Sequence, residues 1–225
     1  MMDNGGGDVS SNEMRGAVRR AILLNEHLLR RAWGILYLAL ALSMFLSIFG
    51  VPIIESLESI GIASAIAIDM TASGCGLIAI LWAFRRVHNT AEITHPEGDR
   101  AWSRLLGYRF MVPLWIVINA ILILTIIFDI GQVALVFELF HFGLAVLLYY
   151  ALRLSFSEKV PGEAVIAIAS LSLSSFASIS LLSITASHAP YALLWAATIV
   201  AWISAGVYAR TRPVPEFEEE HTGLE

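Results

Sequence analysis

Residues 189–209 read APYALLWAATIVAWISAGVYA, a run of 21 residues that contains no charged side chain. A helix of about 20 apolar residues crosses a hydrocarbon core of roughly 30 Å. Such a helix also makes all of its backbone hydrogen bonds internally, which lipid requires. The run therefore predicts a transmembrane helix.

Five further apolar runs precede this one. The six predicted spans are residues 32–51, 59–84, 111–128, 130–152, 164–186 and 189–209. The whole chain has 225 residues, of which 57% are hydrophobic and 15% are charged. This composition leaves too little polar surface to enclose a soluble domain of that size. We expect an all-α integral membrane protein, a six-transmembrane-helix bundle in a cell membrane.

Basic residues predict the orientation of the bundle, because Lys and Arg near a span are retained on the cytoplasmic side. All 14 basic residues fall in the amino-terminal segment, the second-to-third loop, the fourth-to-fifth loop and the tail. The opposite loops carry Glu55, Glu58, Asp129 and His188, with no Lys or Arg. Both termini are therefore predicted to be cytoplasmic.

The chain divides into three predicted parts. Residues 1–31 form a cytoplasmic segment. Within it, apolar and basic residues alternate at helical spacing over residues 17–31, which suits an amphipathic helix in the anionic inner interface. A helix that binds a cytoplasmic partner would have the same pattern. Residues 32–209 form the transmembrane domain, and residues 210–225 form an acidic tail whose Pro and like charges disfavour packing.

The spacing of the spans suggests three tandem two-helix hairpins. The segment from Gly76 to Arg86 is similar to the segment from Gly143 to Arg153, with Gly and Arg in register. Apolar helices that end at a basic boundary also look alike by chance, so the repeat is one of two interpretations. Small residues in the second and fifth spans permit close helix packing, and with it a homo-oligomer.

Polar residues in four of the predicted spans fall at a similar depth near the middle of the membrane. This predicted polar cluster consists of Asp69, Asn119, Glu138, His141, Ser174 and Ser175. Ionisable residues at this depth cost about 2.5 to 3.5 kcal/mol on insertion scales and usually face the bundle or a watery cavity. Glu138 and His141 are three residues apart and therefore share a helix face.

The polar cluster has two interpretations. Burial disfavours the charged form of a carboxyl and imidazole titrates near neutrality, so the cluster could exchange protons in a small transporter or permease-like protein. Alternatively, it is a hydrogen-bonded cluster that fixes helix packing. A third possibility for the protein is a non-catalytic membrane subunit or sensor that engages a cytoplasmic partner through its amino-terminal segment.

Several functional classes have no support in the sequence. The chain lacks the motifs of metallohydrolases, serine hydrolases and phosphate-binding loops, so we expect no enzyme, catalytic residue, metal or cofactor. His141 has no second imidazole at its depth with which to bind haem. Cys75 is the single cysteine. The net charge of −5 argues against a nucleic-acid partner, which leaves the lipid bilayer as the expected environment.

Overall fold

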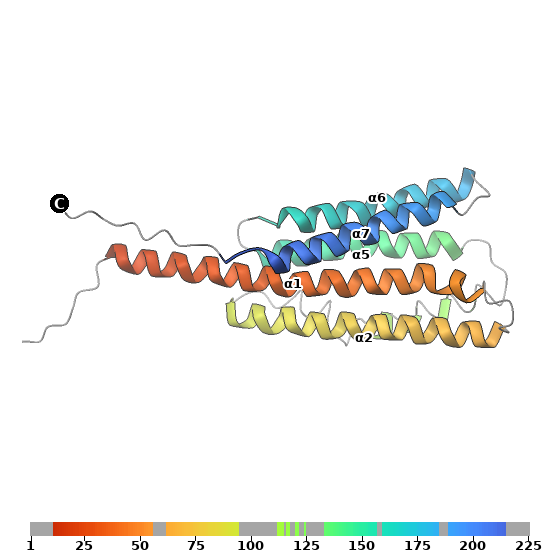
Figure 1. Cartoon of the computed structure of the whole chain (residues 1–225), viewed down its shortest axis with the longest axis horizontal. Coiled ribbons are helices and arrows are strands. Elements are labelled where there is room, and N and C mark those ends of the chain that lie inside the picture. The colour runs from red at the N-terminus through yellow and green to blue at the C-terminus, as the bar shows by residue number, and fades with distance from the viewer. Residues whose placement is uncertain are drawn as a thin grey trace, which may run out of the picture.

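All regular structure in the described part of the chain is helical. A computed structural model describes residues 11–55, 62–94, 133–156, 159–184 and 189–214, with isolated residues between 112 and 124. The helices are α1 (Ser11–Glu55), α2 (Ile62–Thr94), α5 (Val133–Ser155), α6 (Gly162–Ile184) and α7 (Ala189–Thr211). They run alongside one another as an elongated bundle (Figure 1).

Three helical stretches among the described residues are long and apolar enough to cross a membrane. They are Met14–Leu46, Gly162–Ser180 and Pro190–Thr211, in α1, α6 and α7. The predicted first, fifth and sixth spans fall in these helices. The described parts of the second and fourth predicted spans are helical and lie in α2 and α5. Most of the predicted third span, residues 111–128, lies outside the described residues.

Two helices are longer than the predicted spans. α1 is continuous through residue 31, where we expected the chain to turn from an interfacial helix into the first span. α2 runs ten residues past Phe84, into what we expected to be a polar loop. Val87 and Ala91, one helical turn apart, are buried, and this apolar contact explains why the helix continues.

α1 holds the bundle together. It packs against both α2 and α7, while α6 packs against α5 and α7. In Figure 1, α2 lies on one side of α1, and α5, α6 and α7 lie on the other. The amino-terminal part of α1 projects beyond the ends of the other helices (Figure 1).

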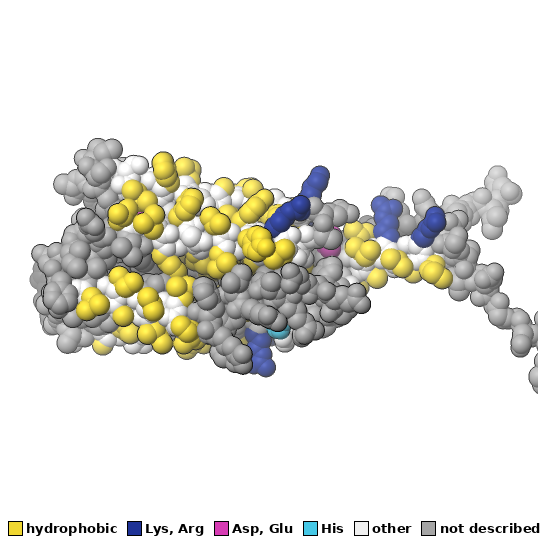
Figure 2. Space-filling model, turned by 180° about the vertical axis from the view of Figure 1, so that it is seen from behind, with side chains coloured by type: hydrophobic (Ala, Val, Ile, Leu, Met, Phe, Trp, Pro, Cys, Tyr) yellow, Lys and Arg dark blue, Asp and Glu magenta, His cyan; other side chains and the backbone are white. Residues whose placement is uncertain are grey.

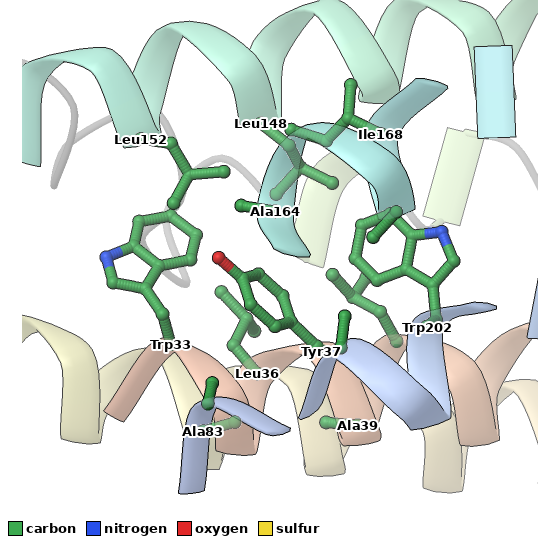
Figure 3. Close-up of a cluster of buried hydrophobic side chains, with 14 of the residues drawn as sticks. Trp33, Leu36, Tyr37, Ala39, Ala83, Leu148, Leu152, Ala164, Ile168 and Trp202 are labelled. Atoms are coloured by element: carbon green, nitrogen blue, oxygen red, sulfur yellow. The ribbon is translucent and has the colours of Figure 1, made fainter. Parts of the chain in front are cut away.

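Aromatic side chains form the centre of the core. Tyr37 of α1 contacts Trp202 of α7 edge to face, with ring centroids 5.7 Å apart, and Trp33 lies 6.1 Å away on its other side. Figure 3 shows Leu148, Leu152, Ala164 and Ile168 of α5 and α6 closing over these rings. Offset and edge-to-face aromatic pairs stabilise a core by about 0.5–1.5 kcal/mol beyond the area they bury. The cluster thus joins four helices.

Two glycines set the distance between α1 and α7. A Cβ added at Gly206 would lie 2.7 Å from Leu38 Cγ and 2.9 Å from the carbonyl oxygen of Gly34. A Cβ added at Gly34 would meet Ala209 Cβ at 3.0 Å. The backbones can approach this closely only because neither residue has a side chain, as at many membrane helix contacts.

An ion pair ties α1 to α6 at the end where α6 begins. The carbonyl of Pro161 accepts hydrogen bonds from the amides of Ala164 and Val165, which starts the helix and places Glu163 in its first turn. Arg30 donates from two nitrogens to the two carboxylate oxygens of Glu163. The carboxylate is buried and also lies at the positive end of the helix dipole.

The outer surface of the bundle is largely apolar. Long hydrophobic side chains on several helices are well exposed, among them Ile78, Ile166, Phe176, Leu193 and Val200. Figure 2 shows hydrophobic side chains spread over the bundle and Lys and Arg side chains gathered toward the end from which α1 projects. An apolar surface of this kind is typical of an interaction with lipid or protein.

Candidate functional site

A carboxylic acid side chain lies completely buried between three helices. Glu138 of α5 is 0% exposed, and neither of its carboxyl oxygens makes a hydrogen bond of good geometry with a described residue. It lies five residues after the start of α5, roughly 7–8 Å along the helix axis. Buried polar groups are nearly always hydrogen-bonded, so an unsatisfied carboxyl requires a physical explanation.

Four uncharged donors surround this carboxyl at distances from which they can act on it. Ser175 and Ser178 approach from α6, and Tyr191 and Trp195 approach from α7. Each pair is spaced by three or four residues, which places its members on one face of their helix. A small rearrangement of these side chains would allow them to hydrogen-bond to the carboxyl.

His141 extends the site along α5. Its side chain is buried, and its ring lies edge to face on Trp195, with centroids 4.9 Å apart. Because His141 follows Glu138 by three residues, the two side chains leave the same face of the helix. The site therefore contains a carboxyl and an imidazole, and Trp195 lies next to both of them.

Hydroxyl groups continue the polar site toward the centre of the bundle. The hydroxyls of Ser174 on α6 and Thr198 on α7 share a hydrogen bond in which either can be the donor. Thr198 also lies 3.1 Å from the carbonyl oxygen of Leu194 and 3.5 Å from that of Ser170. These bonds hold α6 and α7 in register next to Glu138.

The structure brings together four of the six residues of the predicted polar cluster. Glu138, His141, Ser174 and Ser175 are all buried between α5, α6 and α7. Asn119 and the side chain of Asp69 lie outside the described residues. The helix that carries Asp69 packs against α1. The membership of these two residues in the cluster stays a prediction.

Four further residues of the site were not predicted. They are Ser178, Tyr191, Trp195 and Thr198. Those on α7 recur at positions i, i+4 and i+7, which places them on one stripe of the helix. This periodicity was visible in the sequence, but aromatic residues in an apolar span are also expected in any core. Only the packing of α7 beside α5 and α6 shows that these residues belong to the site and not simply to the core.

The chemistry of the donors suits a group that gains and loses a proton. An ionised carboxylate only accepts hydrogen bonds, whereas a protonated one donates one and accepts others. The hydroxyls of Ser175, Ser178 and Tyr191 can donate or accept, so they can serve both forms. No group of three metal-ligating side chains occurs within the described ranges.

Comparisons of the chain with protein-family models, with curated proteins and with solved structures give no match. The function is therefore argued from the site alone.

Proposed function

We propose that the chain crosses a cell membrane six times, with both termini in the cytoplasm. Three apolar helices, the exposed apolar surface and the gathering of basic side chains toward one end support this arrangement (Figure 2). A reporter that is active only in the cytoplasm, fused after Glu225, tests it. We expect activity there and none for a fusion after His188. The reverse pattern would refute the topology.

We propose that the protein is a small transporter that exchanges protons at Glu138. The observation that carries this proposal is the complete burial of Glu138 among uncharged donors from two other helices. Ionisable residues at membrane depth commonly belong to proton relays and substrate pathways. His141 on the same helix face is a second group that can take up or release a proton near neutral pH.

The test uses purified protein in lipid vesicles that contain a trapped pH-sensitive dye. A potassium diffusion potential drives protons inward, and the rate of internal acidification is compared with that of empty vesicles. Glu138→Gln keeps the shape of the side chain but cannot ionise, so we expect it to abolish protein-dependent acidification while thermal unfolding in detergent stays cooperative. A wild-type rate equal to that of empty vesicles, or a Glu138→Gln rate equal to wild type, would refute the proposal.

A serine pair provides a matched control. Ser178 faces the carboxyl, whereas Ser180 is exposed and hydrogen-bonds to the carbonyl of Phe176 in its own helix. Ser178→Ala should slow acidification, and Ser180→Ala should not. Infrared difference spectra supply an independent readout, since a carboxyl band that changes with pH must disappear in Glu138→Gln. If no carboxyl responds to pH, the residues form a closed packing cluster.

A second candidate function is that of a membrane subunit or sensor that binds a cytoplasmic partner. The projecting part of α1 favours it, because Met14, Val18 and Ile22 are all at least half exposed there (Figure 1). This function predicts that a soluble protein co-purifies with the full chain. The co-purifying protein should be absent when residues 1–26 are deleted. Recovery of this chain alone would count against the second function.

A further inference from the structure

One face of the amino-terminal half of α1 continues the face that α7 covers. Gly16, Arg20, Leu23, His27 and Arg31 follow one another at intervals of three or four residues, and the same series continues to Gly34. Gly34 is the residue that touches the end of α7. We call these five residues the basic face of α1. α7 ends before it could cover this face.

The residues at the end of α7 lie next to the basic face. A Cβ at Gly34 would lie 3.0 Å from Arg210 Cγ. Two residues later, Arg212 lies close enough to His27 to act electrostatically on the imidazole. His27 is buried, and its Nε2 has no hydrogen-bond partner among the described residues.

The residues that follow in the sequence have the complementary charge. Residues 216–220 read EFEEE, which gives four carboxylates and one aromatic ring. We propose that this acidic segment binds the basic face of α1, with its carboxylates near Arg20 and Arg31 and its Phe217 against Leu23. Leu23 is 37% exposed and interrupts an otherwise polar face, which an apolar contact would explain.

The chain is long enough for this contact. From Arg212, residues 216 and 220 can reach at most about 14 Å and 28 Å at roughly 3.3–3.6 Å per residue. Along α1, Arg20 lies seven residues from His27, which corresponds to about 10 Å. The first carboxylates can therefore reach Arg20 without displacing any part of the bundle.

The tethered segment is a better occupant than a lipid surface or a second copy. A short flexible connection holds a ligand at an effective concentration in the millimolar range. In the proposed topology, α1 is continuous and runs alongside the helices that cross the bilayer, so its projecting part points away from the bilayer (Figure 1). The basic face therefore cannot lie flat against anionic headgroups unless the helix bends.

The test measures the distance between two spin labels on the full chain in detergent. One label replaces Ala17, beside the basic face, and the other replaces Thr222, with Cys75→Ser to remove the native thiol. We expect a narrow distribution of short distances at low salt. Raising the salt to about 1 M shortens the Debye length from about 10 Å to 3 Å and should broaden the distribution.

Charge variants identify the residues that bind. Replacing the four glutamates of residues 216–220 by glutamine should broaden the distribution, and so should Arg20→Gln. Arg15→Gln is the matched control, since Arg15 lies about 140° away around the same helix. Equal effects of Arg15→Gln and Arg20→Gln would overturn the proposal, as would a distribution that neither salt nor the glutamine variants change.

Two outcomes would assign the basic face to another occupant and overturn the proposal. Short distances between singly labelled chains would identify a second copy. A short distance that is present in detergent but absent in vesicles with anionic phospholipid would identify lipid headgroups. Loss of proton flux at Glu138 has no bearing on these measurements, so this proposal and the proposed function can fail independently.

Discussion

Replacing Arg30 by Gln leaves the carboxylate of Glu163 without its cation. The side chain of Glu163 is 7% exposed and that of Arg30 is 20% exposed, so the two partners differ in their access to water. Glutamine keeps a donor and much of the length of the side chain. The substitution therefore removes the charge with little loss of packing.

The magnitude follows from the burial of the two groups. Removing one partner of a buried pair costs about 3–5 kcal/mol, because a charge is left buried without compensation. The dipole of α6 stabilises the carboxylate that remains by about 0.3–1 kcal/mol. We therefore expect Arg30→Gln to lower the free energy of unfolding by about 2–4 kcal/mol. Glu163→Gln should cost less, about 1–2 kcal/mol, since the guanidinium of Arg30 can turn toward water.

The double variant Arg30→Gln with Glu163→Gln isolates the interaction. It buries two neutral amides in place of the pair, so we expect it to be more stable than Arg30→Gln alone. Unfolding is measured by titration with a denaturing detergent in mixed micelles and followed by tryptophan fluorescence, to which Trp33 and Trp202 of the adjacent core contribute. The expected coupling energy is about 1–3 kcal/mol.

Two results would refute this reasoning. If the costs of the two single variants add in the double variant, the ion pair does not contribute to stability. The second result concerns the order of the two single variants. If Glu163→Gln lowers the free energy of unfolding more than Arg30→Gln does, the less exposed Glu163 is not the group that depends on its partner.

Three further predictions concern contacts between helices. Gly206→Ala places a Cβ 2.7 Å from a leucine of α1 and should lower the free energy of unfolding by about 1–3 kcal/mol. Gly143→Ala, whose Cβ would have no atom within 4 Å, should not lower it. Detergent titration of both variants checks this. Trp202→Ala removes a ring that is 1% exposed and should lower the free energy of unfolding by about 3–5 kcal/mol. Trp82→Ala, at a site that is 54% exposed, should shift the unfolding midpoint little. Thr198→Val removes the hydroxyl that links α7 to α6. It should lower the free energy of unfolding by about 0.6 kcal/mol, an average value for such bonds in membranes. The same titration, with wild type as the reference, measures this loss. A larger loss would mean that the hydroxyl also supports the carboxyl site.

The helical class and the position of the apolar helices could be predicted from hydropathy. The predicted sixth span, residues 189–209, lies within α7, because the uncharged run that ends at Arg210 is long enough for one such helix. The lengths of α1 and α2 could not be predicted in this way. The extension of α2 carries buried apolar residues such as Val87 within a largely polar sequence, and that sequence does not reveal their burial until the packing of α2 against α1 is known.

The candidate site could be predicted only in part for a similar reason. Depth along a span places Glu138 and His141 in one layer, since counting residues gives the height of each side chain in the membrane. The way in which the helices pack determines which of them face that layer. Tyr191 and Trp195 belong to the site because α7 lies beside α5 and α6, and no local pattern in the sequence specifies this neighbour.

The contact between α1 and α7 joins the first described helix of the chain to the last. A ribosome adds roughly 5–20 residues per second, so Gly206 emerges about ten to thirty seconds after Gly34. Throughout that interval the face of α1 that will receive α7 has no partner from its own chain. Closure of the bundle must therefore follow the synthesis of α7, and a chain that stops before α7 would leave this face of α1 open.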